Sequence, residues 1–310
     1  MHRIWRRLIT IPLTMLIVSS LVFFALSFSA GDSSSYVLSE EISESNVEDY
    51  REAQGMSDSL MLRYLDFLWS FIRGEFGQSA AGIEIATLLK QRLPVTLSIS
   101  LLAFLLSLLI AVPLSYITLE KKSIGDILST GWAALMASLP IFLLALFLVI
   151  VFSVWSGLFP VSGYSSLSAG FFKHLRSIFL PSLSIALLHS SFIMLMFRRA
   201  LRESLEKPYS LIASAMGMSK HQRAIISATK PALPVLVAVL AQSFASFLGG
   251  SAAVETVFAI PGVGSLIVNA SLSRDVMLSG TLLMIAALFV SIISFIAECL
   301  IYALDPRRRG

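Results

Sequence analysis

The charged residues of this chain gather in clusters, and they leave six long stretches without Asp, Glu, Lys or Arg. These uncharged stretches are 8–31, 93–119, 127–172, 177–197, 231–254 and 276–297. Each reaches the roughly 20 residues that an α-helix needs to cross about 30 Å of hydrocarbon. The pattern predicts an all-α integral membrane protein with six transmembrane helices, provided that 127–172 crosses only once.

The composition points to the same class of protein. Hydrophobic residues make up 56% of the chain and charged residues 14%, whereas soluble domains carry about 25% charged residues. A soluble domain is therefore excluded, and membrane lipid is the first expected partner.

The placement of basic residues predicts the orientation. If 127–172 crossed twice, the basic segment between Arg198 and Lys230 would be exported, whereas short basic loops stay in the cytoplasm. With one crossing, fifteen of the 23 Lys and Arg residues lie on the cytoplasmic side. They are Arg3, Arg6, Arg7, Lys121, Lys122, Arg198, Arg199, Arg202, Lys207, Lys220, Arg223, Lys230, Arg307, Arg308 and Arg309. Both termini are then cytoplasmic. The net charge of +4 reflects this orientation, and we expect no nucleic-acid partner.

Residues 1–31 are interpreted as a basic flank followed by the first transmembrane helix. The alternative is a cleaved secretory signal, with Ser27, Ser29 and Ala30 at the cleavage site. A signal has an apolar core of about 7–15 residues, which is shorter than the stretch 8–31. We therefore expect the segment to be retained.

Residues 32–92 are the only long hydrophilic segment and are predicted to form an extracytoplasmic loop. After a polar first part, Arg63, Asp66, Ser70 and Arg73 recur at helical intervals. They leave a broad apolar face made of Leu62, Leu65, Phe67, Leu68, Trp69, Phe71 and Ile72. We expect an amphipathic helix along the outer membrane interface, ended by Gly74 and Gly77.

A polar and basic island at 206–234 separates two apolar stretches and is predicted to contain a short helix. Pro208 suits the first helical turn, and Gly217 suits the left-handed residue after the last turn. An apolar side at helical spacing is formed by Leu211, Ile212, Ala215 and Met216, and Met218 extends it past the glycine. A helix this short is marginal alone, so we expect it to dock into a groove of a partner. An amphipathic helix that lies on the membrane is the alternative.

The sequence of this island resembles a known loop. Ala-Ser-Ala-Met-Gly at 213–217 and Thr-Lys-Pro-Ala-Leu-Pro at 229–234 are similar to the cytoplasmic coupling loop of ABC-transporter permease subunits that import oligopeptides, dipeptides or nickel. Leu211 stands where the wider permease motif has Glu, and the spacing to Pro234 is one residue shorter than usual.

Further markers extend the resemblance over nearly the whole chain. The turns Gly74–Ser79 and Gly157–Gly163 resemble extracytoplasmic turns of the same family. Between the last two apolar stretches, Glu255-Thr-Val-Phe258, Pro261-Gly-Val-Gly264 and Arg274-Asp275 match family markers. Ser294 departs from the Asn usual in this group.

The resemblance implies an organisation, a set of partners and a candidate site. It implies three regions: 1–31 with the first span, the loop 32–92, and a permease core 93–310 whose coupling loop 201–231 lies between spans 4 and 5. The implied partners are a second homologous permease, two cytoplasmic ATP-binding subunits and an extracytoplasmic solute-binding protein, all at the bacterial inner membrane. The residues implied to couple to the ATPase are Tyr209, Leu211, Ile212, Ala213, Ala215, Met216, Gly217 and Met218.

Two ionisable residues lie within the predicted transmembrane helices. His189 is in the fourth stretch and Glu298 follows the sixth, and such residues mark pathways by default. Packing is the competing interpretation, with His189 neutral and hydrogen-bonded to Ser190 or Ser191.

Missing motifs limit the chemistry. The chain has no phosphate-binding Gly-x-x-x-x-Gly-Lys-Ser/Thr loop and one cysteine, Cys299, so we expect no enzyme activity, no cofactor bound by this chain and no thiolate metal site. ATP would bind the partner subunits. The predicted function is that of a permease subunit of an importer, with peptides preferred over nickel or another small solute. An ion-coupled secondary transporter or a channel is the alternative of another class.

Overall fold

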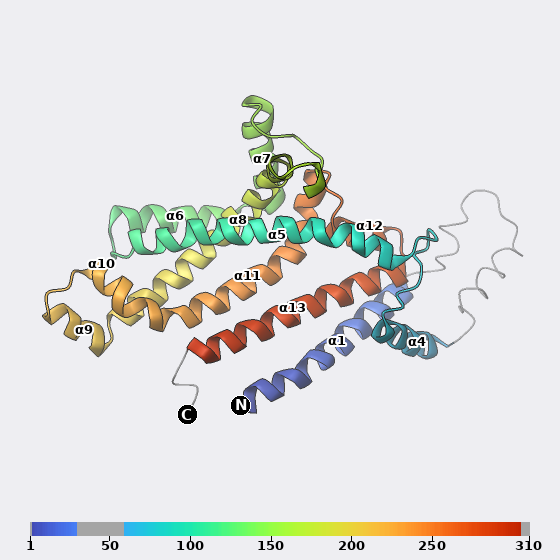
Figure 1. The fold of residues 1–310 in the computed structure, drawn as a ribbon, viewed down its shortest axis with the longest axis horizontal. Coiled ribbons are helices and arrows are strands. Elements are labelled where there is room, and N and C mark those ends of the chain that lie inside the picture. Colours follow the sequence, from blue (N-terminus) through green and yellow to red (C-terminus); the bar gives the residue numbers. More distant parts are fainter. Residues whose placement is uncertain (1, 30–58, 305–310) are drawn as a thin grey trace, which may run out of the picture. The chain divides into compact units, whose positions relative to one another are not determined.

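The computed structural model describes residues 2–29 and 59–304, and every regular element in these ranges is helical (Figure 1). The polar first part of the predicted outer loop, up to residue 58, and the C-terminal Arg307–Arg309 lie outside the described residues. The chain divides into two compact units, Met1–Val95 with Pro261–Phe289, and Thr96–Ile260 with Val290–Gly310.

The first unit contains α1 (His2–Ser29), α4 (Leu60–Arg73), the start of α5 (Ile85–Ile117), α12 (Val263–Leu272) and the start of α13 (Val276–Leu304). One core cluster joins Phe23, Tyr64, Phe67 and Met284. The Tyr64 hydroxyl lies 2.8 Å from the Ser19 hydroxyl, which fastens α4 to α1. A second cluster joins α5, α12 and α13 through Ile85, Leu89, Val263, Ala270, Leu278 and Leu282.

The helix α4 confirms the predicted amphipathic element and its end. Gly74 adopts φ +76° and its N–H donates to the carbonyl of Phe71, as a left-handed helix cap requires. Tyr64 and Phe67 are buried, whereas Leu62, Leu65, Trp69 and Ile72 keep more than half of their area exposed. The predicted apolar set thus divides between one side that packs inside the unit and one side that faces outward.

The Arg-Asp marker has a structural role in the first unit. Asp275 is buried and accepts a hydrogen bond from the N–H of Leu278 at 2.9 Å, which caps the start of α13. Its second oxygen accepts from the N–H of Ala80 at 2.6 Å. The carboxylate therefore joins the turn after α4 to the last helix.

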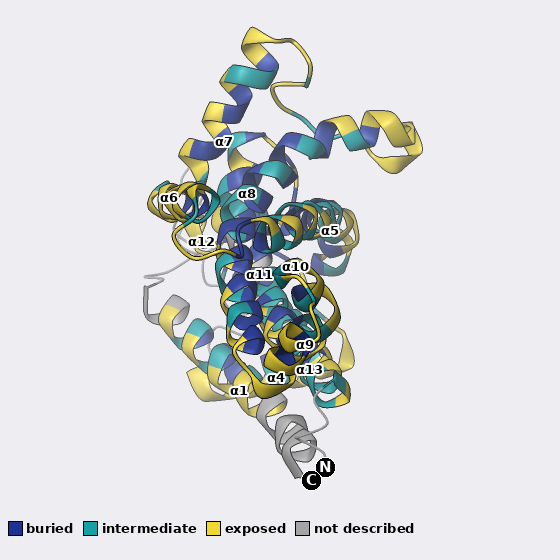
Figure 2. Ribbon diagram, turned by 90° about the vertical axis from the view of Figure 1, so that its left-hand side faces the viewer, coloured by how far each residue is buried: buried dark blue, intermediate teal, exposed yellow. Residues whose placement is uncertain are grey.

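The second unit is built around α8 (Phe171–Leu205). The apolar stretch of α8 is 61% buried, against 28–39% for the other long apolar helices, and Figure 2 draws most of α8 in dark blue or teal. Around it pack α6 (Ile124–Ser138), α7 (Ile141–Val149) and α11 (Thr229–Val257), and the rest of α5 joins them through hydrogen bonds and the shared core. Their shared core is formed by Ala111, Leu119, Ala133, Ile193, Met194, Phe197, Ala200, Leu201, Leu205, Ala224, Ala228, Ala232, Leu236 and Val239.

The third uncharged stretch forms a broken helix. α6 and the following helix, which runs from Ile141 through the π-helical turn at Ile150–Trp155, meet at an angle of 103°. The break falls at Leu139, whose ψ of 126° is extended, because the residue before a proline is pushed out of the helical region. The stretch predicted to cross the membrane once thus contains two helical segments that meet at Pro140, and the single crossing remains a prediction.

Four helices in the described ranges are long and apolar enough to cross a membrane, and the bent pair would make a fifth. The four are α5, α8, α13 and the helix that runs from Lys220 into α11. In α1 the apolar helical segment is Pro12–Ala25, which is shorter than the four long helices. By length and apolar composition these helices fit a multi-pass membrane protein, and the count of six remains a prediction.

Candidate functional site

The short helix predicted in the polar island is α9 (Pro208–Ala215), and its sequence specifies both ends. Lys207 is extended and Pro208 occupies the first helical turn, where the missing N–H is not needed. At the other end Gly217 has φ +85°. Its N–H donates to the carbonyl of Ser214 at 3.0 Å, and the N–H of Met218 donates to that of Ala213 at 3.2 Å. This paired arrangement is a Schellman motif.

The predicted contact residues divide between two sides of α9. Leu211, Ile212 and Met216 are 56%, 63% and 75% exposed, and Ala215 is exposed beside them. We call these four residues the α9 apolar face. Tyr209 is 37% exposed next to this face, Gly217 is exposed and Met218 is half-buried. Ala213, in contrast, is buried together with Ser210, so it packs inside the chain.

The inner side of α9 rests on the segment that follows it. The Arg223 guanidinium donates to the carbonyl of Ser210 at 3.4 Å. Arg223 ends α10 (Lys220–Arg223), which begins with a capping box between Ser219 and Gln222. A π-helical turn then leads into α11, and its Ala224 and Ala228 are fully buried in the core of the second unit. The side of α9 opposite its apolar face is thus packed against the segment that follows it.

An ionic network that the sequence analysis missed lies at the adjoining end of α8. One Asp126 oxygen lies 3.0 Å from Arg198 and 2.9 Å from Arg202. Arg198 is buried and also donates to the hydroxyls of Ser129 at 2.6 Å and Thr130 at 3.0 Å. The available signal was an acidic residue that opens one apolar stretch and two arginines, four residues apart, that close another.

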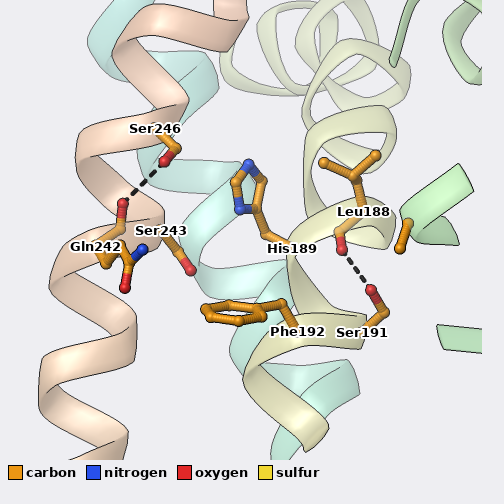
Figure 3. Close-up of a pocket in the computed structure, with 8 residues that line it drawn as sticks. Leu188, His189, Ser191, Phe192, Gln242, Ser243 and Ser246 are labelled. Carbon is orange, nitrogen blue, oxygen red and sulfur yellow. Dashed lines mark hydrogen bonds between the residues drawn. The ribbon is translucent and has the colours of Figure 1, made fainter. Parts of the chain in front are cut away.

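His189 lines a cavity of about 320 Å³ between α6, α8 and α11. Its ring packs edge-to-face on Phe247, with the ring centroids 4.7 Å apart. Ser190 and Ser191 donate to the carbonyls of Leu187 and Leu188, and within the described residues His189 has no hydrogen bond. The expected bond from His189 to a neighbouring serine is therefore wrong. Figure 3 shows His189 between α8 and the polar side chains of α11.

The carboxylates of Glu298 and Glu255 do not line this cavity. Glu298 is half-buried on α13. Glu255, a family marker near the end of α11, is fully buried and accepts a hydrogen bond from the Thr96 hydroxyl at 2.8 Å. Among the described residues, no group of three His, Cys, Asp or Glu gathers as a metal site would need.

Comparison with known proteins identifies a consistent set of relatives. A family described as the binding-protein-dependent transport system inner membrane component matches residues 103–310. A probable peptide ABC transporter permease protein of Sinorhizobium fredii is 28% identical over 99% of this chain and 98% of its own length. A putative peptide transport system permease protein of Brucella abortus is 31% identical over 95% of each chain. A nickel import system permease protein of Staphylococcus aureus is 26% identical, covering 98% of this chain and 90% of its own.

Proposed function

This chain belongs to the family of binding-protein-dependent transport system inner membrane components, and we propose that it forms half of the pathway of an ATP-driven peptide importer and contacts an ATPase through α9. It is a multi-pass protein of the inner membrane. The observation that carries the proposal is the α9 apolar face, which is exposed on a helix too short to be stable in isolation.

A groove on a cytoplasmic partner is the expected complement of that face. Apolar residues at helical spacing bind grooves as anchors, and Leu211, Ile212 and Met216 have this spacing and exposure. ATP would bind and be hydrolysed on the partner, whose closure would push α9. Because the inner side of α9 contacts α10 and the π-helical turn, these segments would transmit that movement to α11 and to the core around α8.

The other partners follow from the family. Its description supports a solute-binding protein that delivers the cargo. A second, homologous permease would supply the other half of the pathway, and two ATP-binding subunits would serve the pair. The membrane spans of the two permeases would alternate between a conformation open to the outside and one open to the cytoplasm.

Peptides are the proposed cargo because the relatives named for peptides include the one at 31% identity over 95% of both chains. Nickel is the second candidate, and the 26% identical nickel permease supports it. Growth on peptides as the only source of a required amino acid, compared with nickel accumulation, would distinguish the two.

We further propose six spans with both termini inside, and α4 along the outer interface. The outward Leu62, Leu65, Trp69 and Ile72 support the position of α4. A nitroxide at Leu65 should then collide more often with lipid-dissolved oxygen than one at the exposed Asp66, and equal collision rates would contradict the position.

Substitution within α9 tests the contact with the ATPase. Ile212→Asp places a charge in the α9 apolar face, whereas Ser214→Asp is a matched control because Ser214 is exposed on the same helix outside that face. Loss of an anchor in an interface costs about 2 kcal/mol or more, or roughly 30-fold in affinity. We expect Ile212→Asp to abolish co-purification of the ATPase and Ser214→Asp to preserve it. Normal co-purification with Ile212→Asp would contradict the proposal.

A further inference from the structure

The cavity beside His189 has a polar side and an apolar side. Its volume is about 320 Å³, at the lower end of the roughly 300–1,000 Å³ typical of small-molecule sites. Figure 3 shows His189 and Phe192 from α8 facing Gln242, Ser243 and Ser246 from α11. Leu188 and Ala137 complete the apolar side.

One polar group of this cavity is buried without a partner. Ser243 is 2% exposed, and its hydroxyl has no hydrogen bond. Ser190 and Ser184 on α8, in contrast, donate to carbonyls of their own helix. Because nearly all buried polar groups in native proteins are paired with protein or water, the Ser243 hydroxyl can take a partner that enters the cavity.

The other polar groups provide complementary chemistry. The Ser191 and Ser246 hydroxyls donate to Leu188 and Gln242 carbonyls, which leaves their oxygens as acceptors. The Gln242 carboxamide offers both donors and an acceptor, and a neutral imidazole such as that of His189 offers one of each. The lining therefore consists of uncharged donors and acceptors against an apolar wall.

We propose that this cavity binds a neutral amide, namely the backbone of a peptide in transit. A peptide bond carries one donor and one acceptor without net charge, which is what Ser243, Gln242 and His189 complement. A divalent cation would find in His189 the single strong ligand of this lining. The inference rests on the proposed function, and it adds a contact that recognises the part of the cargo common to all peptides.

The test uses thiol protection in the complete purified importer in lipid nanodiscs. With Cys299→Ala as background, Ser243→Cys should react with a small water-soluble methanethiosulfonate reagent, and tri-alanine should slow the reaction. Free alanine, which lacks an amide, should protect only at far higher concentration. Ser184→Cys is the matched control, because Ser184 is a fully buried serine outside the cavity and should not react.

A second variant tests recognition itself. Adding Gln242→Leu to Ser243→Cys should raise the tri-alanine concentration for half-protection about two- to tenfold, as expected for one lost hydrogen bond. No reaction at Ser243→Cys, no protection by tri-alanine, or protection by Ni²⁺ instead would each overturn the proposal. Co-purification of the ATPase is measured on the same samples, so failure of the α9 contact is recognised separately.

Discussion

At the scale of single residues, the conformation of Gly217 is the clearest link between sequence and the candidate site. Its φ of +85° lies in the left-handed region, which costs other L-residues about 1–2 kcal/mol. A Cβ at this position would meet no atom within 4 Å. The requirement for glycine is therefore one of backbone conformation and not of space.

Substitution of Gly217 should consequently weaken the α9 end while the membrane helices stay intact. We expect Gly217→Val to lose ATPase co-purification and transport. Gly217→Asn should keep most of both, because Asn tolerates the left-handed region. Gly131→Val is the control, since Gly131 has open space around it and no positive φ. Wild-type transport by Gly217→Val would show that this end of α9 is not needed for coupling.

Local sequence signals explain which features of α9 and α4 could be predicted. Pro208 and Gly217 bracket α9, and Gly74 ends α4, because helix caps depend on a few neighbouring residues. The separation of Ala213 from the exposed residues depends on what packs beneath α9, and sequence spacing does not contain that information.

At the scale of elements, the ionic network joins α6 to the end of α8. Asp126 forms ion pairs with both Arg198 and Arg202, whose side chains are 5% and 19% exposed, and its single charge offsets one of their two charges. Such a network couples residues more than 70 positions apart, and the position of Asp126 before the third uncharged stretch contains no sign of its partners in α8. The break at Pro140 had a local signal in the proline, but its 103° angle depends on packing.

Loss of the shared carboxylate should destabilise the second unit strongly. Asp126→Ala leaves the buried Arg198 and the half-buried Arg202 together without a counter-charge. Removal of one partner of a fully buried pair costs about 3–5 kcal/mol, and we expect a smaller loss here because Asp126 is 18% exposed. The Arg199–Glu203 pair is the comparison, because its side chains are 76% and 62% exposed and an exposed pair contributes at most about 1 kcal/mol. Thermal unfolding in detergent should show a large drop for Asp126→Ala and a small one for Glu203→Ala. Equal drops would contradict the role of the network.

At the scale of the whole molecule, composition predicted the class of protein, which the family match confirms. The placement of charges predicts an orientation, and both inferences depend on sums over many residues. The uncharged stretches other than the third correspond to long helices, of which α5, α8 and α13 are the clearest, whereas the third is bent by 103° at Pro140. The cavity beside His189 was not predicted, because it forms where α8 and α11 bring distant side chains together.

The predicted orientation has a direct test in intact cells. With Cys299 replaced, a cysteine at Ser43 should react with a membrane-impermeant thiol reagent, and a cysteine at Lys220 should not, because basic loops remain in the cytoplasm. Reaction of Lys220→Cys should appear once the cells are opened, which controls for its accessibility. The reverse labelling pattern would contradict the six-span topology.

Uptake of tri-alanine by liposomes that contain the complete importer tests the central claim most directly. The measurement compares wild type, Ile212→Asp and Ser214→Asp, with ATP and the solute-binding protein each present or omitted, and with an ion gradient in place of ATP. We predict uptake by wild type and Ser214→Asp only when ATP and the binding protein are both present, and none by Ile212→Asp. Uptake driven by the ion gradient alone, or undiminished uptake by Ile212→Asp, would contradict the account.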